Sequence, residues 1–195
     1  MTLDQERAIF RQELGHALNE WAEVENSIRY AVLTIASTEE QRRALSVGYF
    51  AIEAFRSKLA FANSTLARNF AGTALADEWE ELHKRANAAS GKRNKLAHRT
   101  AKEYEEAKAG RRVLLVPWRY PKPKKKTTSP KPPDDSLGLR AVVECRLEFT
   151  ALSAAILNWA FRASGKAEPF EKDVEKAGRV PSVAALLKQA RTLFK

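Results

Sequence analysis

Residues 75–98, LADEWEELHKRANAASGKRNKLAH, carry the pattern that decides the fold class of this chain. Apolar side chains recur there at steps of three and four residues, which is the spacing of one face of an α-helix. The stripe comprises Leu75, Trp79, Leu82, Ala86, Ala89, Arg93 and Leu96. A guanidinium group on a buried helix face is costly unless it is paired or faces water. Arg93 is therefore expected to serve a function, to reach the surface, or to pair with a carboxylate such as Glu53.

The same spacing predicts two further long helices on the N-terminal side. Thr2 with Gln5, and Thr38 with Gln41, have the spacing of capping boxes at the two helix starts. The two apolar stripes comprise Phe10, Leu14, Leu18, Trp21, Val24, Ile28, Val32 and Ile35, and then Leu45, Tyr49, Ile52, Phe55, Leu59, Ala62, Leu66 and Phe70. Residues 1–104 are thus predicted to hold three helices, the second of which is unbroken as far as Gly72.

The pattern changes in the second half of the chain. Two short runs rich in β-branched residues, 111–116 and 140–145, predict a two-stranded hairpin over residues 111–146. Residues 117–136 between them hold six of the eight prolines and six basic residues, so we expect a disordered basic loop there.

Helical spacing then returns. It predicts a fourth helix at residues 147–164 and a short C-terminal helix at 181–194, with Pro181 in its first turn. The chain is accordingly predicted to be one all-α domain, an up-and-down four-helix bundle with the hairpin and basic loop inserted before its fourth helix.

The composition favours a polyanionic partner. The chain of 195 residues has a net charge of +10 and a pI of about 9.8, which suits nucleic acid or an anionic membrane surface. Cys145 is the only cysteine, which excludes an internal disulfide and a Cys-based zinc site. The N-terminus lacks signal-peptide features, and no stretch approaches the roughly 18 apolar residues that span a bilayer. We expect a soluble, cytoplasmic protein.

No pattern for a cofactor or metal is present in the sequence. It contains no phosphate-binding glycine loop, no nucleophile elbow and no histidine–carboxylate cluster at metal-ligand spacing. We therefore expect neither a cofactor nor a metal site.

The stretch Arg93-Asn94-Lys95-Leu96-Ala97-His98 places an arginine, an amide and a histidine near the end of the third predicted helix. Asn94 and His98 are four residues apart and share a helix face. Arg93 lies about 140° from His98 around the axis, so the two side chains would flank a groove.

This stretch resembles the arginine–polar–three residues–histidine motif of the HEPN superfamily, a group of small helical bundles that includes many RNA-cleaving toxins and defence proteins. The resemblance covers residues 2–104 and 147–164 and implies a HEPN-like bundle. It also implies a homodimer in which two motifs line a shared cleft, and an antitoxin or defence protein as a possible partner.

The activity that the resemblance implies is metal-independent cleavage of RNA. His98 would take the proton of a ribose 2′-hydroxyl, Arg93 would hold the phosphate, and Asn94 would orient His98 or donate to a phosphate oxygen. The basic side chains expected to attract the RNA backbone are Lys92, Lys95, Arg99, Lys58 and Arg85.

Two positions depart from the toxin branch of the family. Thr100 stands where those toxins carry the tyrosine that is adenylylated, and Arg99 stands in place of the usual glycine. These differences argue against regulation by adenylylation and change the mouth of any cleft.

Three functions therefore remain open from the sequence. The first is a toxin or phage-defence ribonuclease, and the second is a non-catalytic HEPN module that binds RNA, a nucleotide or a partner protein. The third is a cationic helical scaffold that holds nucleic acid or an acidic protein with residues 122–131. His98 could also simply end its helix, where a positive imidazole interacts favourably with the helix dipole.

Overall fold

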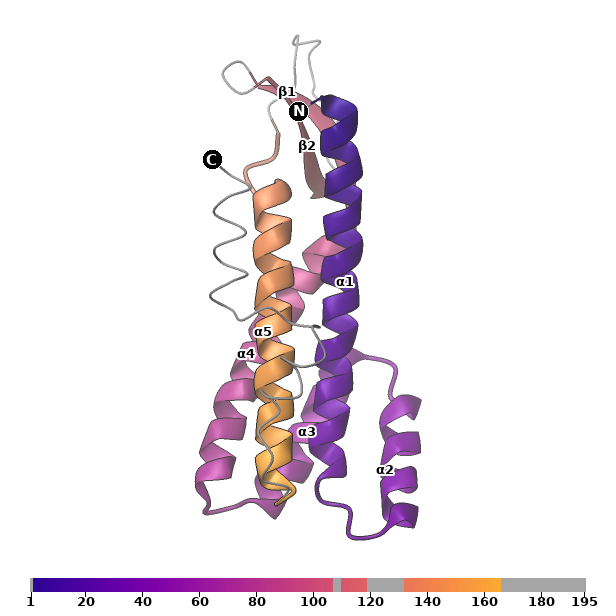
Figure 1. The fold of residues 1–195 in the computed structure, drawn as a ribbon, viewed down its shortest axis with the longest axis vertical. Helices are drawn as coiled ribbons and strands as arrows, with labels where there is room; N and C mark the ends of the chain where they lie inside the picture. Colours follow the sequence, from indigo (N-terminus) through magenta and orange to yellow (C-terminus); the bar gives the residue numbers. More distant parts are fainter. Residues whose placement is uncertain (1, 107–109, 119–131, 166–195) are drawn as a thin grey trace, which may run out of the picture.

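The computed structural model describes residues 2–106, 110–118 and 132–165. The elements in chain order are α1 (Leu3–Leu33), α2 (Glu39–Ala51), α3 (Phe55–Asn69), α4 (Ala74–Ala97), β1 (Arg99–Glu106), β2 (Gly110–Pro117) and α5 (Leu139–Ala163). This part of the chain is mostly helical, and Figure 1 shows the small antiparallel hairpin at the end of the helical body where α1 begins. Of the predicted disordered loop 117–136, residues 117, 118 and 132–136 are described, and the prediction is wrong for 133–136, which form a turn in which Ser136 N–H donates to the carbonyl of Pro133. Residues 119–131 and the predicted helix 181–194 lie outside the described residues. None of the helices described is both long enough and apolar enough to cross a membrane.

Helices α1 and α5 lie side by side and form the largest interface among the described elements (Figure 1). An ion pair joins Glu13 to Arg146 at 2.8 Å, and the buried hydroxyls of Ser27 and Ser153 are 2.8 Å apart. Because the partners increase together in residue number, the two helices are parallel. Trp21 of α1 packs edge-on against Phe149 of α5, with ring centroids 5.2 Å apart.

The directions of the helices follow from their contacts. Lys58 of α3 pairs with Glu25 of α1, and α3 runs in the same direction as α1 and α5 (Figure 1). Helix α4 alone among these four runs the other way, and it pairs with α5 through Lys92–Glu148 near one end. Helix α2 runs opposite to α1, because Ser46 bonds to Arg29 and Tyr49 bonds to Glu25. Consecutive helices therefore alternate in direction along the chain (Figure 1), and the predicted helical content is confirmed.

Tryptophans fill the core where α3, α4 and α5 meet. Trp79 and Trp159 lie 5.2 Å apart between ring centroids, and both are buried. Trp79 donates its indole N–H to Asn63 Oδ1 at 3.2 Å, and Trp159 donates to the carbonyl of Leu75 at 2.9 Å. Each ring thus adds buried apolar area without an unpaired donor.

The second predicted helix is two helices, α2 and α3, separated by residues 52–54. Tyr49 donates its hydroxyl to the carbonyl of Glu25 at 3.0 Å, and Lys58 donates to the Glu25 carboxylate at 3.0 Å. In one straight helix, residues nine apart are separated by about 13 Å along the axis, so both could not reach Glu25. The chain therefore reverses between them, and the prediction of an unbroken helix is wrong.

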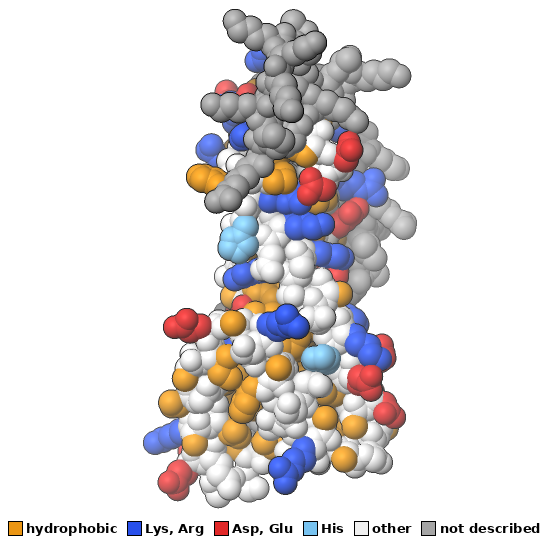
Figure 2. All heavy atoms as spheres, turned by 180° about the vertical axis from the view of Figure 1, so that it is seen from behind, with side chains coloured by type: hydrophobic (Ala, Val, Ile, Leu, Met, Phe, Trp, Pro, Cys, Tyr) orange, Lys and Arg blue, Asp and Glu red, His pale blue; other side chains and the backbone are white. Residues whose placement is uncertain are grey.

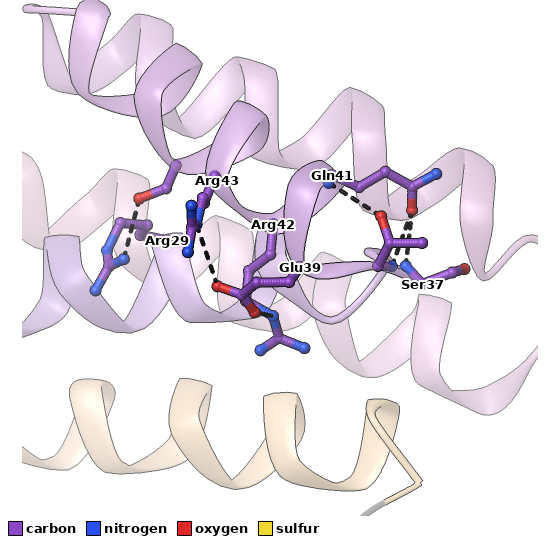
Figure 3. Close-up of polar contacts among 8 residues, drawn as sticks. Arg29, Ser37, Glu39, Gln41, Arg42 and Arg43 are labelled. Carbon is purple, nitrogen blue, oxygen red and sulfur yellow. Dashed lines mark hydrogen bonds and ion pairs between the residues drawn. The ribbon is translucent and has the colours of Figure 1, made fainter.

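Helix α2 packs against α1 and begins with the predicted capping box. Gln41 accepts backbone N–H bonds from Ser37 at 2.9 Å and Thr38 at 3.3 Å, while Thr38 Oγ1 accepts the N–H of Gln41 (Figure 3). Glu39, in the first turn, pairs with Arg42 and Arg43 (Figure 3). The capping box predicted at Thr2 is also present at the start of α1.

The hairpin is present, but one of its predicted strands is wrong. The run 111–116 lies in β2 as predicted, and β2 pairs with β1, in a register that aligns Arg99 with Pro117. Residues 140–145 instead form the first turns of α5, which starts at Leu139 rather than residue 147. Val142 and Val143 are buried on the inward face of α5. Their β-branched side chains lower helix propensity only slightly, so they do not prevent a helix here.

Candidate functional site

The motif predicted to be functional lies at the C-terminal end of α4. His98 is the C-cap residue, and its backbone N–H donates to the carbonyl of Asn94 at 3.0 Å. The side chains of Asn94 and His98 are exposed, one turn apart, and β1 begins directly after His98. The end of α4 thus holds an amide and an imidazole on the surface next to the hairpin.

Arg93 is half-buried, as its place on the apolar stripe predicts. Its Nη1 donates to Asn94 Oδ1 at 3.2 Å, but its buried Nε has no hydrogen-bond partner. Glu53, proposed from the sequence as a possible partner, makes no ion pair with it in the described part of the chain. A buried guanidinium N–H without an acceptor costs free energy, so this group is suited to an acceptor from outside the chain.

Arg93 lies between two pockets. The first has a volume of about 530 Å³ and is lined by Trp21, Phe55, Arg56, Asn87, Ser90, Arg93 and Asn94. The second, of about 410 Å³, is lined by Leu18, Trp21, Ala22, Glu25, Asn26, Tyr49, Phe50, Lys58, Arg93 and Ala97. The first pocket brings Arg93 and Asn94 together with residues of α1 and α3, whereas His98 lines neither pocket.

Glu25 organises the second pocket. Its carboxylate accepts the indole N–H of Trp21 at 2.7 Å and the ammonium of Lys58 at 3.0 Å. Burial, and then the charge of Glu25, raise the pKa of the Tyr49 hydroxyl, which stays protonated and donates to the Glu25 carbonyl. The carboxylate fixes Trp21, which both pockets share.

Three of the five predicted RNA-binding side chains are engaged in ion pairs. Lys92 pairs with Glu148, Lys58 with Glu25, and Arg99 with Asp135. The remaining two, Lys95 and Arg85, are exposed and form no ion pair within the described ranges. Figure 2 shows Lys, Arg and His side chains across the middle of the face opposite to that of Figure 1.

The first pocket also contains Asn87, Ser90 and Arg56, which were not among the residues predicted to be functional. Asn87, Ser90 and Asn94 follow one another at steps of three and four residues, so their shared face on α4 was visible in the sequence. The place of Arg56 in the pocket could not be predicted from the sequence, because its position opposite α4 depends on the break between α2 and α3.

Metal binding and thiol chemistry find no support in the described part of the chain. Residues 2–106, 110–118 and 132–165 hold no group of three or more His, Cys, Asp or Glu side chains placed to bind a metal ion. Cys145 is buried, and burial raises the pKa of its thiol.

Comparisons of the chain with models of known protein families, with curated proteins and with solved structures find no match.

Proposed function

We propose that this chain is a metal-independent endoribonuclease of the HEPN type that acts as a toxin or phage-defence effector. The observation that carries the proposal is Arg93, whose buried Nε lacks an acceptor and which faces a polar pocket beside Asn94. An anionic phosphate oxygen is the acceptor that a guanidinium group binds best. His98 is exposed one turn beyond Asn94, within the same end of α4.

The proposed reaction needs only these groups. The His98 imidazole takes the proton of a ribose 2′-hydroxyl, and the resulting oxygen attacks the adjacent phosphorus. The bond from phosphorus to the 5′-oxygen breaks and that oxygen takes a proton, from the His98 imidazolium or from water in exchange with it, which leaves a 2′,3′-cyclic phosphate and a 5′-hydroxyl. Arg93 donates to the phosphate oxygens that gain charge in the transition state, while Asn94 holds the Arg93 guanidinium in place through their hydrogen bond.

We further propose that the active form is a homodimer with a composite site. Arg93 faces a pocket that His98 does not line, so a second copy supplies the missing group from across an interface. Tyr30, Val47 and Phe50 expose half or more of their surface, and Phe50 also lines the second pocket. Exposed apolar side chains of this size are typical of interaction surfaces.

End-labelled RNA incubated with purified protein in EDTA tests the activity. Wild type should cleave and leave a 2′,3′-cyclic phosphate, whereas His98→Ala and Arg93→Ala should lose about 10²-fold or more. His16→Ala is the matched control, because His16 is an exposed histidine on α1. Equal cleavage by His98→Ala and wild type would exclude the proposed base.

Mixing the two inactive variants tests the composite site. If each catalytic site draws Arg93 from one copy and His98 from the other, mixed dimers of Arg93→Ala and His98→Ala contain one intact site and regain part of the activity. No recovery, with mixed dimers demonstrated by mass spectrometry, would place both groups in one subunit.

The second candidate function is a non-catalytic module that binds RNA, a nucleotide or a partner protein. It is favoured by the separation of His98 from both pockets and by the ion pairs of Lys92, Lys58 and Arg99. Binding of RNA without cleavage by any variant would support this function over the ribonuclease.

A further inference from the structure

The first pocket, beside Arg93, is lined by two cations and no described carboxylate. Arg56 reaches it from α3 and Arg93 from α4, while Asn87 and Asn94 supply side-chain amides. Arg56 is exposed and makes no ion pair with another described residue. The Nε of Arg93 also lacks a partner. Two guanidinium groups without a counter-charge at one concave site indicate an anionic ligand.

The side-chain amides of the pocket suit the same ligand, whereas Ser90 has no donor to offer it. The hydroxyl of Ser90 donates to the carbonyl of Asn87 at 2.7 Å, so its oxygen can accept but has no proton left to donate. The amide of Asn94 accepts from Arg93, which leaves its NH₂ group available as a donor. Donors from two amides and two guanidinium groups therefore face an acceptor-rich ligand such as phosphate.

The start of α3 adds further positive potential to this pocket. Phe55 and Arg56 are the first two residues of the helix and both line the pocket. The N-cap, Ala54, makes no side-chain cap, and the first turn has no acidic residue, as is also true of α5, whereas α1 and α2 begin with capping boxes and acidic first turns. An arginine at this end of a helix opposes the dipole, so the arrangement is unfavourable until an anion is bound.

We infer that this pocket is a phosphate-binding subsite in which Arg56 and Arg93 are the cations. Its volume of about 530 Å³ lies within the range of about 300–1,000 Å³ of small-ligand sites and exceeds what a single phosphate needs. It can therefore hold a nucleotide, with half-buried Phe55 as an apolar wall beside Trp21, 4.6 Å away between ring centroids.

The subsite extends the proposed function, and it rests on that function where the phosphate belongs to RNA. An RNA strand whose scissile phosphate is held by Arg93 lies in this pocket, where Arg56 would bind the same phosphate or the adjacent one while the second copy brings His98 to it. A free nucleotide offers the same phosphate chemistry, so the experiment must separate the two sources.

Calorimetric titration of the full chain tests the subsite with two probes. The first is adenosine 5′-monophosphate, with adenosine as the probe that lacks phosphate; the second is a short single-stranded RNA, titrated into the non-cleaving His98→Ala background. Arg56→Gln should weaken binding of a phosphate-bearing probe by about tenfold or more, because a hydrogen-bonded charge is lost. Arg68→Gln, which removes an exposed arginine from the last turn of the same helix, should change it by less than about twofold.

The two probes identify the source of the phosphate. Arg56-dependent binding of both supports a general phosphate subsite, and Arg56-dependent binding of RNA alone supports a subsite for the RNA backbone. Equal affinities of Arg56→Gln and Arg68→Gln for both probes, or adenosine binding as tightly as its monophosphate, would overturn the inference.

Two further measurements distinguish loss of the phosphate subsite from loss of the fold and from loss of ribonuclease activity. Arg56→Gln should melt at a higher temperature than wild type without ligand, because a positive charge has left the positive end of α3; a lower melting temperature would indicate a structural role. Cleavage by wild type with Arg56-independent binding would refute the subsite alone, whereas Arg56-dependent binding without cleavage would refute the ribonuclease alone.

Discussion

Replacing Glu25 by glutamine should destabilise the bundle through two neighbours at once. The Glu25 carboxylate accepts from Trp21 Nε1 at 2.7 Å and from Lys58 Nζ at 3.0 Å. Glutamine has one side-chain oxygen and one NH₂ group, so it can serve only one of these donors and turns its own donors toward the other. The ammonium of Lys58 is then left without a counter-charge at a site where its side chain is 15% exposed.

The size of the effect follows from the exposure of the pair. A hydrogen bond to a charged group contributes about 1.5–3 kcal/mol, and the side chains of Glu25 and Lys58 are 23% and 15% exposed, so water replaces part of it. We expect a loss of about 1–2 kcal/mol in the free energy of unfolding. For a chain of this length that corresponds to about 2–8 °C in melting temperature.

Urea denaturation followed by circular dichroism measures the change. Glu23→Gln is the control, because Glu23 is exposed on the same helix and its substitution should stay within about 0.5 kcal/mol of wild type. The double variant Glu25→Gln/Lys58→Met should recover at least half of the loss, because the unpaired charge is removed. If Glu25→Gln matches Glu23→Gln, or if the double variant is less stable than Glu25→Gln, the pair does not stabilise the fold in the way argued.

Three further outcomes are expected. Ser27→Ala should lower the free energy of unfolding by about 1–2 kcal/mol, because Ser27 donates within α1 and the buried Ser153 hydroxyl, which donates to Ser27, would lose its acceptor. The double variant Ser27→Ala/Ser153→Ala should lose less than the single variant, and additive losses in urea denaturation would contradict this. Cys145, buried and with a raised pKa, should react with iodoacetamide far more slowly at neutral pH in the folded protein than in urea, and equal rates would show that α5 opens readily. The hydrogen bond from Arg162 lowers the pKa of Glu78. The Arg162–Glu78 pair therefore contributes about 0.2–1 kcal/mol to stability above the ordinary carboxyl pKa of about 4.3, and this contribution is lost as the pH falls through the lowered pKa of Glu78. The stability difference between wild type and Arg162→Gln should therefore vanish at the acid end of a pH series, and a constant difference would exclude this origin.

The sequence predicts those features of the fold that depend on neighbouring residues. The capping boxes at Thr2 and Thr38 were predicted correctly, because the interacting groups are three residues apart. The break between α2 and α3 was missed, because residues 52–54 contain no proline or glycine and the apolar spacing continues from Ile52 to Phe55. The contact that requires the break, between Lys58 and Glu25, spans 33 residues.

The hairpin and the candidate site illustrate the same limit. Residues 140–145 contain the paired valines typical of a strand, and only their burial against the rest of the bundle distinguishes them as helix. Arg93 was predicted to lie on an inward face because helical periodicity is local, and it is half-buried. Arg56 could not be placed beside it, because their proximity depends on the path of the chain between α2 and α3.

The parallel pairing of α1 with α5 has a consequence for the time at which the protein can fold. The last residue of α5 follows the last residue of α1 by 130 positions, so α1 leaves the ribosome long before its main partner exists. At about 5–20 residues per second, this delay is about 6–26 s. Throughout it the part of the α1 surface that α5 covers is exposed, and Trp21 lacks Phe149, against which it packs in the finished structure. Every residue that lines the two pockets around Trp21 precedes α5 in the chain, so a nascent chain truncated before residue 139 would contain the whole lining but would lack Phe149, which packs against Trp21.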